Sequence, residues 1–77
     1  MNLIDARTKA LSERKDGKIR LTMESPKYFI FEMVPKTAKD SDQYEDSLVS
    51  VNKKTGKFDV YQPSEDWDDY DKATIIE

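Results

Sequence analysis

The 77-residue sequence contains no cysteine and no histidine. Without cysteine it can form no disulfide bond and offers no thiolate nucleophile or ligand. Without histidine it lacks the commonest general base, the usual activator of a serine nucleophile and the commonest zinc ligand. Its only glycines are Gly17 and Gly56, so it has no glycine-rich phosphate loop. We therefore predict no enzyme, no catalytic residue and no cofactor site.

The acidic run at 66–71 invites comparison with a calcium-binding loop. Asp66 and Asp68 have the alternating spacing of calcium ligands. However, the run has no glycine for the sharp bend and no glutamate at the closing position. Acidic residues at the start of a helix, where the helix dipole favours negative charge, explain the run more simply. We predict no metal site.

Long apolar runs are also missing. No segment approaches the roughly 18 residues of a membrane span, and the N-terminus lacks the pattern of a signal peptide. These absences predict a cytoplasmic protein without membrane contact. Hydrophobic residues make up 36% of the chain and charged residues 38%, but the apolar residues gather in strand-length stretches. The sequence thus predicts a single folded domain over residues 1–77, with the apolar stretches at 19–23, 28–34, 48–51 and 58–61.

The first element predicted is a helix over 3–15, capped by Asn2. Its expected inner face repeats at helical spacing and comprises Leu3, Ile4, Arg7, Ala10, Leu11 and Arg14. Asp16 and Gly17 would end the helix with a left-handed residue.

Two antiparallel hairpins should follow. In the first, strand 18–24 alternates strictly, which would place Ile19, Leu21 and Met23 on one face. Strand 28–34 is rich in aromatic and β-branched residues and should be central and buried on both faces. The second hairpin pairs 47–52 with 57–62 through a turn in which Gly56 takes a positive φ, as a type I turn with a G1 bulge. The long polar loop 36–46 between them is of a length often associated with function or mobility.

A short helix over 64–73, capped by Ser64, is predicted near the end of the chain, with Trp67 and Tyr70 on one face. Residues 74–77 could end this helix, pair with a sheet edge or fray. The predicted fold class is therefore α+β: an N-terminal helix packed on a four-stranded antiparallel sheet of two hairpins, with a short C-terminal helix.

Charge is distributed unevenly along the chain. Residues 1–39 carry nine basic and five acidic residues, whereas residues 40–77 carry four basic and eleven acidic residues. This asymmetry fits either a solvated surface or two oppositely charged faces that favour head-to-tail self-association or a complementary partner. Nucleic acid is not expected as a partner, because the pI is near 4.9 and core packing explains the aromatic residues Tyr28, Phe29 and Phe31.

The acidic C-terminal half contains the candidate contact for a protein partner. Aromatic residues dominate the energetics of many interfaces, and here they lie among carboxylates. Alternatively, both rings simply hold the last helix on the sheet. The candidate residues are Asp66, Trp67, Asp68, Asp69 and Tyr70.

The order of elements, with a Tyr-Phe-Ile-Phe strand, a polar loop and the stretch Ser-Leu-Val-Ser-Val-Asn-Lys-Lys-Thr-Gly-Lys, resembles small proteins encoded by phages and prophages of Gram-positive bacteria. The hairpin around Asn-Lys-Lys-Thr-Gly-Lys also resembles the terminal hairpin of PepSY-type domains. The first resemblance implies an accessory or structural phage protein that acts by protein–protein contact, in the host cytosol or the virion. The alternative is a small inhibitor, immunity-like or nucleic-acid-mimicking module that uses its acidic half.

Overall fold

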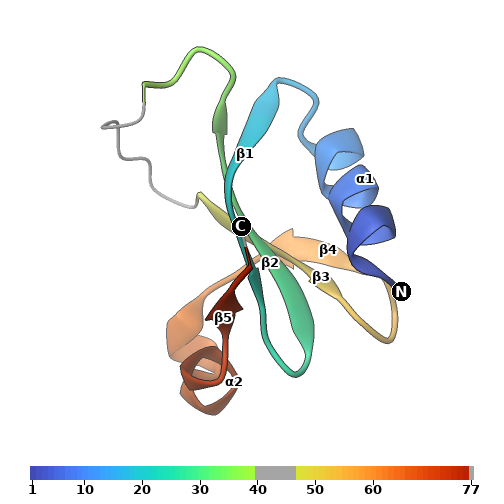
Figure 1. Ribbon diagram of the computed structural model, residues 1–77, viewed down its shortest axis with the longest axis vertical. Helices are drawn as coiled ribbons and strands as arrows, with labels where there is room; N and C mark the ends of the chain where they lie inside the picture. The colour runs from blue at the N-terminus through green and yellow to red at the C-terminus, as the bar shows by residue number, and fades with distance from the viewer. Residues whose placement is uncertain (40–46, 77) are drawn as a thin grey trace.

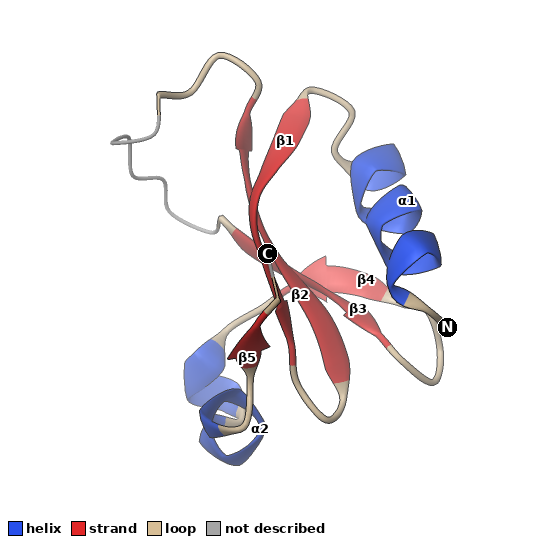
Figure 2. Ribbon diagram, in the orientation of Figure 1, coloured by secondary structure: helices blue, strands red, loops and turns tan. Residues whose placement is uncertain are grey.

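The computed structural model describes residues 1–39 and 47–76. All strand pairs are antiparallel, and the sheet order is β4-β3-β2-β1-β5 (Figures 1 and 2). This confirms the predicted α+β class and the central position of the second strand. The elements are α1 (Leu3–Glu13), β1 (Gly17–Glu24), β2 (Tyr28–Pro35), β3 (Leu48–Asn52), β4 (Phe58–Val60), the 3-10 turn η1 (Pro63–Glu65), α2 (Trp67–Asp71) and β5 (Thr74–Ile75).

The sheet has five strands rather than the predicted four, because the C-terminal residues form the additional strand β5. Thr74 and Ile75 pair with Glu24 and Met23 at the edge of β1, so of the three outcomes considered for the C-terminus, pairing with the sheet is the one observed. Within the predicted long loop, residues 40–46 lie outside the described part of the chain. Lys18 Nζ and Arg20 donate to the carbonyls of Ala38 and Lys39, which ties the start of that loop to β1.

Helix α1 covers one face of the sheet with small side chains. The Asn2 side chain accepts from the Asp5 amide at 2.9 Å, which confirms the predicted N-cap. The buried residues of the helix are Ala6 and Ala10, and their small size lets the helix backbone lie close to the sheet. Ile4, predicted to face inward, is 74% exposed, because the true inner face is rotated toward Ala6.

The predicted stop of α1 was also wrong. The helix ends at Glu13, and the Arg14 amide closes it by donating to the Ala10 carbonyl. Among the described glycines only Gly56 has a positive φ. Gly17 therefore starts β1 in ordinary extended geometry, where its amide donates to the Arg14 carbonyl.

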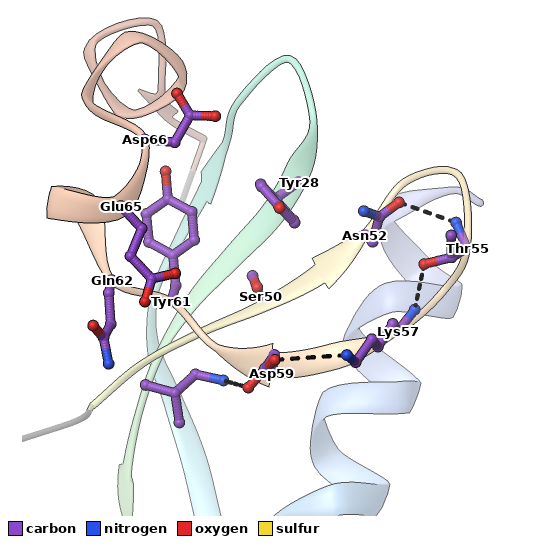
Figure 3. A pocket seen from close by; sticks show the side chains of 11 residues that line it. Tyr28, Ser50, Asn52, Thr55, Lys57, Asp59, Tyr61, Gln62, Glu65 and Asp66 are labelled. Carbon is purple, nitrogen blue, oxygen red and sulfur yellow. Dashed lines mark hydrogen bonds and ion pairs between the residues drawn. The ribbon is translucent and has the colours of Figure 1, made fainter.

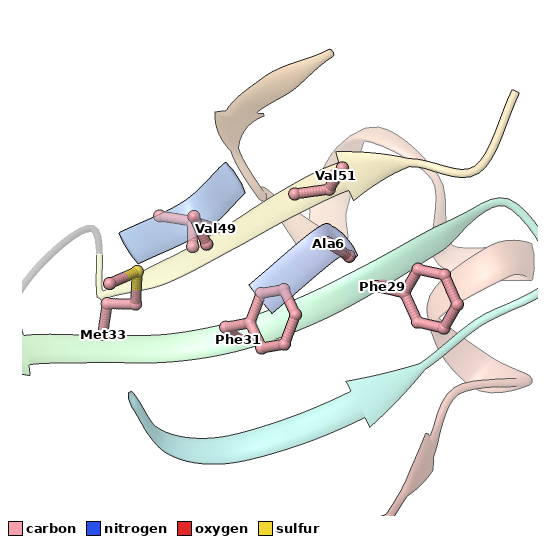
Figure 4. Packing of buried hydrophobic residues seen from close by; sticks show 7 residues of the cluster. Ala6, Phe29, Phe31, Met33, Val49 and Val51 are labelled. Carbon is pink, nitrogen blue, oxygen red and sulfur yellow. The ribbon is translucent and has the colours of Figure 1, made fainter. Parts of the chain in front are cut away.

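A hydrophobic core fills the space between α1 and the sheet (Figure 4). Strand periodicity directs alternate residues of β2 and β3 toward the helix, where Leu3, Ile19 and Phe58 pack around their edges. The buried members of this core are Ala6, Ala10, Phe29, Phe31, Met33, Val49 and Val51.

A β-bulge in β1 breaks the predicted alternation. The register between β1 and β2 shifts between Ile19 and Leu21, so Ile19 joins the α1 side while Leu21 and Met23 lie on the other side. The inserted residue is Arg20, whose Nε donates to Glu32 Oε1 at 2.9 Å across the strand pair. A bulge reverses the side-chain order downstream of it, and for that reason Ile19, Leu21 and Met23 do not share a face.

The turn of the second hairpin is held by Asn52. Its side-chain oxygen accepts from the amides of Lys54 and Thr55, and its carbonyl accepts from the Gly56 amide. Gly56 has φ of +72°, as predicted. The loop is one residue longer than the expected type I turn with a G1 bulge, because the closing bond spans Asn52 to Gly56.

Replacing Gly56 should therefore destabilise the fold. Gly56→Ala forces a Cβ into the left-handed region, and we expect unfolding free energy to fall by about 1 kcal/mol or more. Gly56→Asn should lose less, because asparagine tolerates that region. Urea denaturation measures both, with Lys54→Ala as the control in the same turn. Equal stability of the alanine variant and wild type would contradict the assigned turn.

Candidate functional site

The C-terminal segment folds back over the sheet face opposite α1 (Figures 1 and 2). The predicted short C-terminal helix is confirmed, but its bounds of 64–73 were wrong, because the segment divides into η1 and α2 at Asp66. Asp66 adopts φ −153° and ψ 77°, and its Oδ1 accepts from the Asp69 amide at 3.1 Å. An aspartate that satisfies the first amides of a helix favours a helix start rather than a helix interior. Asp66, not Ser64, is thus the N-cap.

Asp69 anchors the segment to the sheet from a buried position, being only 3% exposed. Its Oδ1 accepts from the Lys27 amide at 3.0 Å, in the turn between β1 and β2. Its Oδ2 accepts from the Tyr61 hydroxyl at 3.2 Å. Burial, together with the nearby Asp69 carboxylate, raises the pKa of the Tyr61 phenol above its ordinary value of 10.0. Three separated parts of the chain therefore meet at one carboxylate.

Asp66 reinforces this anchor at the surface. Its Oδ2 lies 2.8 Å from Lys27 Nζ. This hydrogen bond lowers the pKa of Asp66 and raises the pKa of Lys27. Asp66 and Asp69 both serve the internal structure, so two of the five candidate contact residues already have partners within the chain.

The two candidate aromatic residues have different surroundings. The Tyr70 ring is half-buried and lies 6.0 Å from the Tyr61 ring, in the second hydrophobic cluster with Met23 and Ile30. The Trp67 ring touches the Tyr70 ring edge-on at a centroid distance of 6.0 Å, yet it is 57% exposed. Tyr70 thus packs the segment on the sheet, whereas Trp67 stands on it as an exposed indole beside the exposed Asp68.

A groove of about 360 Å³ opens on the same sheet face, between the β3–β4 hairpin and η1 (Figure 3). The floor of the groove consists of side chains that share one face of the sheet. Ser50 and Asp59 are cross-strand partners, and Asn52 lies two residues further along β3. Tyr28 and Tyr61 contribute aromatic walls, with their rings edge-to-face at 5.6 Å.

Sequence reasoning missed this groove. The feature of the sequence that could have indicated the groove is the Val-Ser-Val pattern of β3, in which a small polar residue separates two core valines. Val49 and Val51 face α1, so Ser50 faces the opposite side, where a larger side chain would fill the groove.

Ser50 and Lys53 lie on opposite faces of the sheet and do not form a serine–lysine pair. Lys53 bonds to Glu24 and lies over the Phe29 ring at 5.0 Å, which is the α1 side of the sheet. Ser50 lies on the other side. Within residues 1–39 and 47–76, no group of three or more acidic residues is arranged to hold a metal ion.

The aromatic residues considered for nucleic acid are divided between the two faces. Phe29 and Phe31 are buried under α1, so their rings cannot stack on bases. Tyr28 is half-buried in the groove on the opposite face.

Comparison with models of known protein families, with curated protein sequences and with solved structures gave no match for this chain. In the part of the chain that the structure describes, no helix has the length and apolar character needed to cross a membrane.

Asp69→Ala should destabilise the protein by about 2 kcal/mol, because it leaves the Lys27 amide and the Tyr61 hydroxyl without their acceptor. Asp68→Ala is the matched control, since the neighbouring carboxylate is exposed, and it should change stability by no more than about 0.5 kcal/mol. Thermal unfolding of both variants compares them directly. Equal losses would show that Asp69 does not anchor the segment.

Tyr61 should make stability depend on alkaline pH. The unfolded chain ionises this phenol near pH 10, whereas the folded chain keeps it protonated. Above pH 10 the unfolded state therefore binds fewer protons, and stability should fall as the pH rises. Urea denaturation between pH 8 and pH 11 should show a smaller decline for Tyr61→Phe than for wild type. Parallel declines would contradict the raised pKa.

Proposed function

We propose that this chain is a non-enzymatic accessory or structural protein of a phage or prophage, acting in the host cytosol or the virion by binding another protein. The phage assignment derives from the resemblance of its sequence pattern to such proteins. Binding through protein contact is supported by the surface around α2.

The observation that carries the proposal is the exposed indole of Trp67 on a firmly anchored segment. Tryptophan is among the residues most enriched at energetically dominant interface positions. Its neighbours Asp66, Asp69 and Tyr70 hold the segment on the sheet through hydrogen bonds, an ion pair and ring packing. A partner would therefore meet an aromatic side chain whose backbone is already ordered, which lowers the entropy cost of binding.

The alternative function is an inhibitor, immunity-like or nucleic-acid-mimicking module. The observation that favours it is the set of exposed carboxylates near Trp67. Glu65, Asp68 and Asp71 are exposed, and none has an ion-pair or hydrogen-bond partner for its carboxylate among the described residues. A partner of this kind would be a basic, nucleic-acid-binding protein, and duplex DNA should displace the chain from it.

Trp67→Ala should abolish partner capture while leaving the fold intact. Because the indole is mostly exposed, we expect a stability loss below about 1 kcal/mol. Tagged wild type and variant would be compared in cells that carry the natural genome, before and after prophage induction. Recovery of the partner that wild type enriches should fall at least tenfold with the variant.

Ile4→Ala is the matched control, because Ile4 is also an exposed large apolar residue but lies on α1. It should retain the partner. Sedimentation at low and at 0.5 M salt tests whether the partner is a second copy of the chain, which would appear as association lost in Trp67→Ala. Identical capture by both variants, or a monomeric wild type that enriches nothing, would overturn the proposal.

A further inference from the structure

The groove between β3–β4 and η1 contains a buried polar group to which no residue in 1–39 or 47–76 bonds. Ser50 is 4% exposed, and Figure 3 shows its side chain rising from β3 into the groove. Its hydroxyl has no hydrogen-bond partner among the described residues. No fully enclosed side-chain nitrogen or oxygen in that part of the chain lacks a partner, so the hydroxyl opens into the groove. The Ser50 hydroxyl is thus available to a ligand that enters the groove.

The remaining groups around Ser50 are mostly acceptors and aromatic surfaces. The Glu65 carboxylate and the Tyr28 hydroxyl also have no partner among the described residues. By contrast, Asp66 is paired with Lys27, and Asp59 accepts from the Val60 amide and lies 4.0 Å from Lys57 Nζ. Of the lining carboxylates, Glu65 is therefore the one whose charge no described residue engages.

The charge of the groove selects a cationic ligand. Three carboxylates line it, from Asp59, Glu65 and Asp66. Lys57 lies 4.0 Å from Asp59 and Lys27 lies 2.8 Å from Asp66, so Glu65 supplies the net negative charge. This field repels phosphates and acidic peptides and attracts cations. A guanidinium suits the groups better than an ammonium, because its planar donors can pair bidentately with one carboxylate while its face stacks on a tyrosine ring.

We propose that this groove binds an arginine side chain of a partner polypeptide, with Glu65 pairing the guanidinium, Ser50 accepting a hydrogen bond from it, and Tyr28 or Tyr61 stacking on its face. The volume of about 360 Å³ lies at the lower end of the range for small-ligand sites and suits one side chain. The inference deepens the proposed function by giving the chemistry of the partner, but it uses residues other than Trp67.

The test is titration of the ¹⁵N-labelled full chain with N-acetyl-arginine amide, followed by amide chemical shifts. We expect saturable shifts centred on Ser50, Asn52 and Tyr28, with a Kd on the order of millimolar, as is usual for one side chain. Glu65→Gln should weaken binding about tenfold, and Ser50→Ala about threefold. Asp68→Asn removes the same charge from a neighbouring exposed position outside the groove, and should change Kd less than twofold.

Three results would overturn the inference: equal weakening by Glu65→Gln and Asp68→Asn, equal affinity for N-acetyl-lysine amide, or shifts centred away from the groove. Tighter binding of free L-arginine than of the blocked form would refute a polypeptide ligand. Trp67→Ala should bind the probe like wild type. A failed titration with Trp67-dependent capture intact therefore rejects the groove alone, and the reverse result rejects the proposed function alone.

Discussion

The carboxylate of Asp69 connects the turn after β1, the end of β4 and helix α2 through hydrogen bonds to the Lys27 amide and the Tyr61 hydroxyl. These two bonds hold the C-terminal segment on the sheet face that α1 leaves uncovered. The position of Trp67 depends on them because it lies two residues before the anchor. The wall of the groove depends on these bonds as well. Turn η1 leads directly into the anchored helix, and Tyr61, which lines the groove, donates one of the two bonds to Asp69. Both proposed contacts therefore rest on one buried acid.

The two faces of the sheet differ in the size and polarity of their side chains, and this difference gives them different roles. On the α1 side, two alanines of the helix meet phenylalanine and valine side chains, and the contact is closed to water. On the other side, tyrosines take the place of phenylalanines; the Tyr61 hydroxyl bonds to Asp69, and Tyr28 lines the groove. The first face supplies the stable core, while the second face combines a smaller core with polar groups available for recognition.

Sequence patterns were sufficient where local chemistry decides the structure. Gly56, the Asn2 cap and the two-sided burial of β2 all follow from a single residue type or from a short period. The alternation of β1 failed because the bulge at Arg20 is stabilised by Glu32 on another strand, which no local pattern of β1 contains. The predicted short C-terminal helix is present, but its start was placed too early, because Asp66 caps it through the Asp69 amide and pairs with Lys27 on another part of the chain.

The candidate contact residues also show that a sequence pattern does not reveal which neighbouring side chains are buried. Sequence composition grouped the four residues around Trp67 with it because they are adjacent, but burial separates Asp69 and Tyr70 from the exposed indole. The groove was missed because its lining comes from four separate segments that only the folded chain brings together. The Val-Ser-Val pattern is present in the sequence, but it indicates a groove only once α1 is known to cover the valine side of the sheet and not the Ser50 side.

Hydrogen exchange of the Lys27 backbone amide tests the central role of Asp69 most directly. Lys27 is an exposed residue in a turn, and an amide in such a place normally exchanges quickly unless it is bonded. If the Asp69 carboxylate holds it, the Lys27 amide in the wild-type protein should be protected and should exchange at the same rate as the Tyr70 and Ala73 amides, because all three are released when the C-terminal segment lifts from the sheet. Exchange of Lys27 at the rate of an unstructured peptide, with the strands β1 and β2 still protected, would contradict the account.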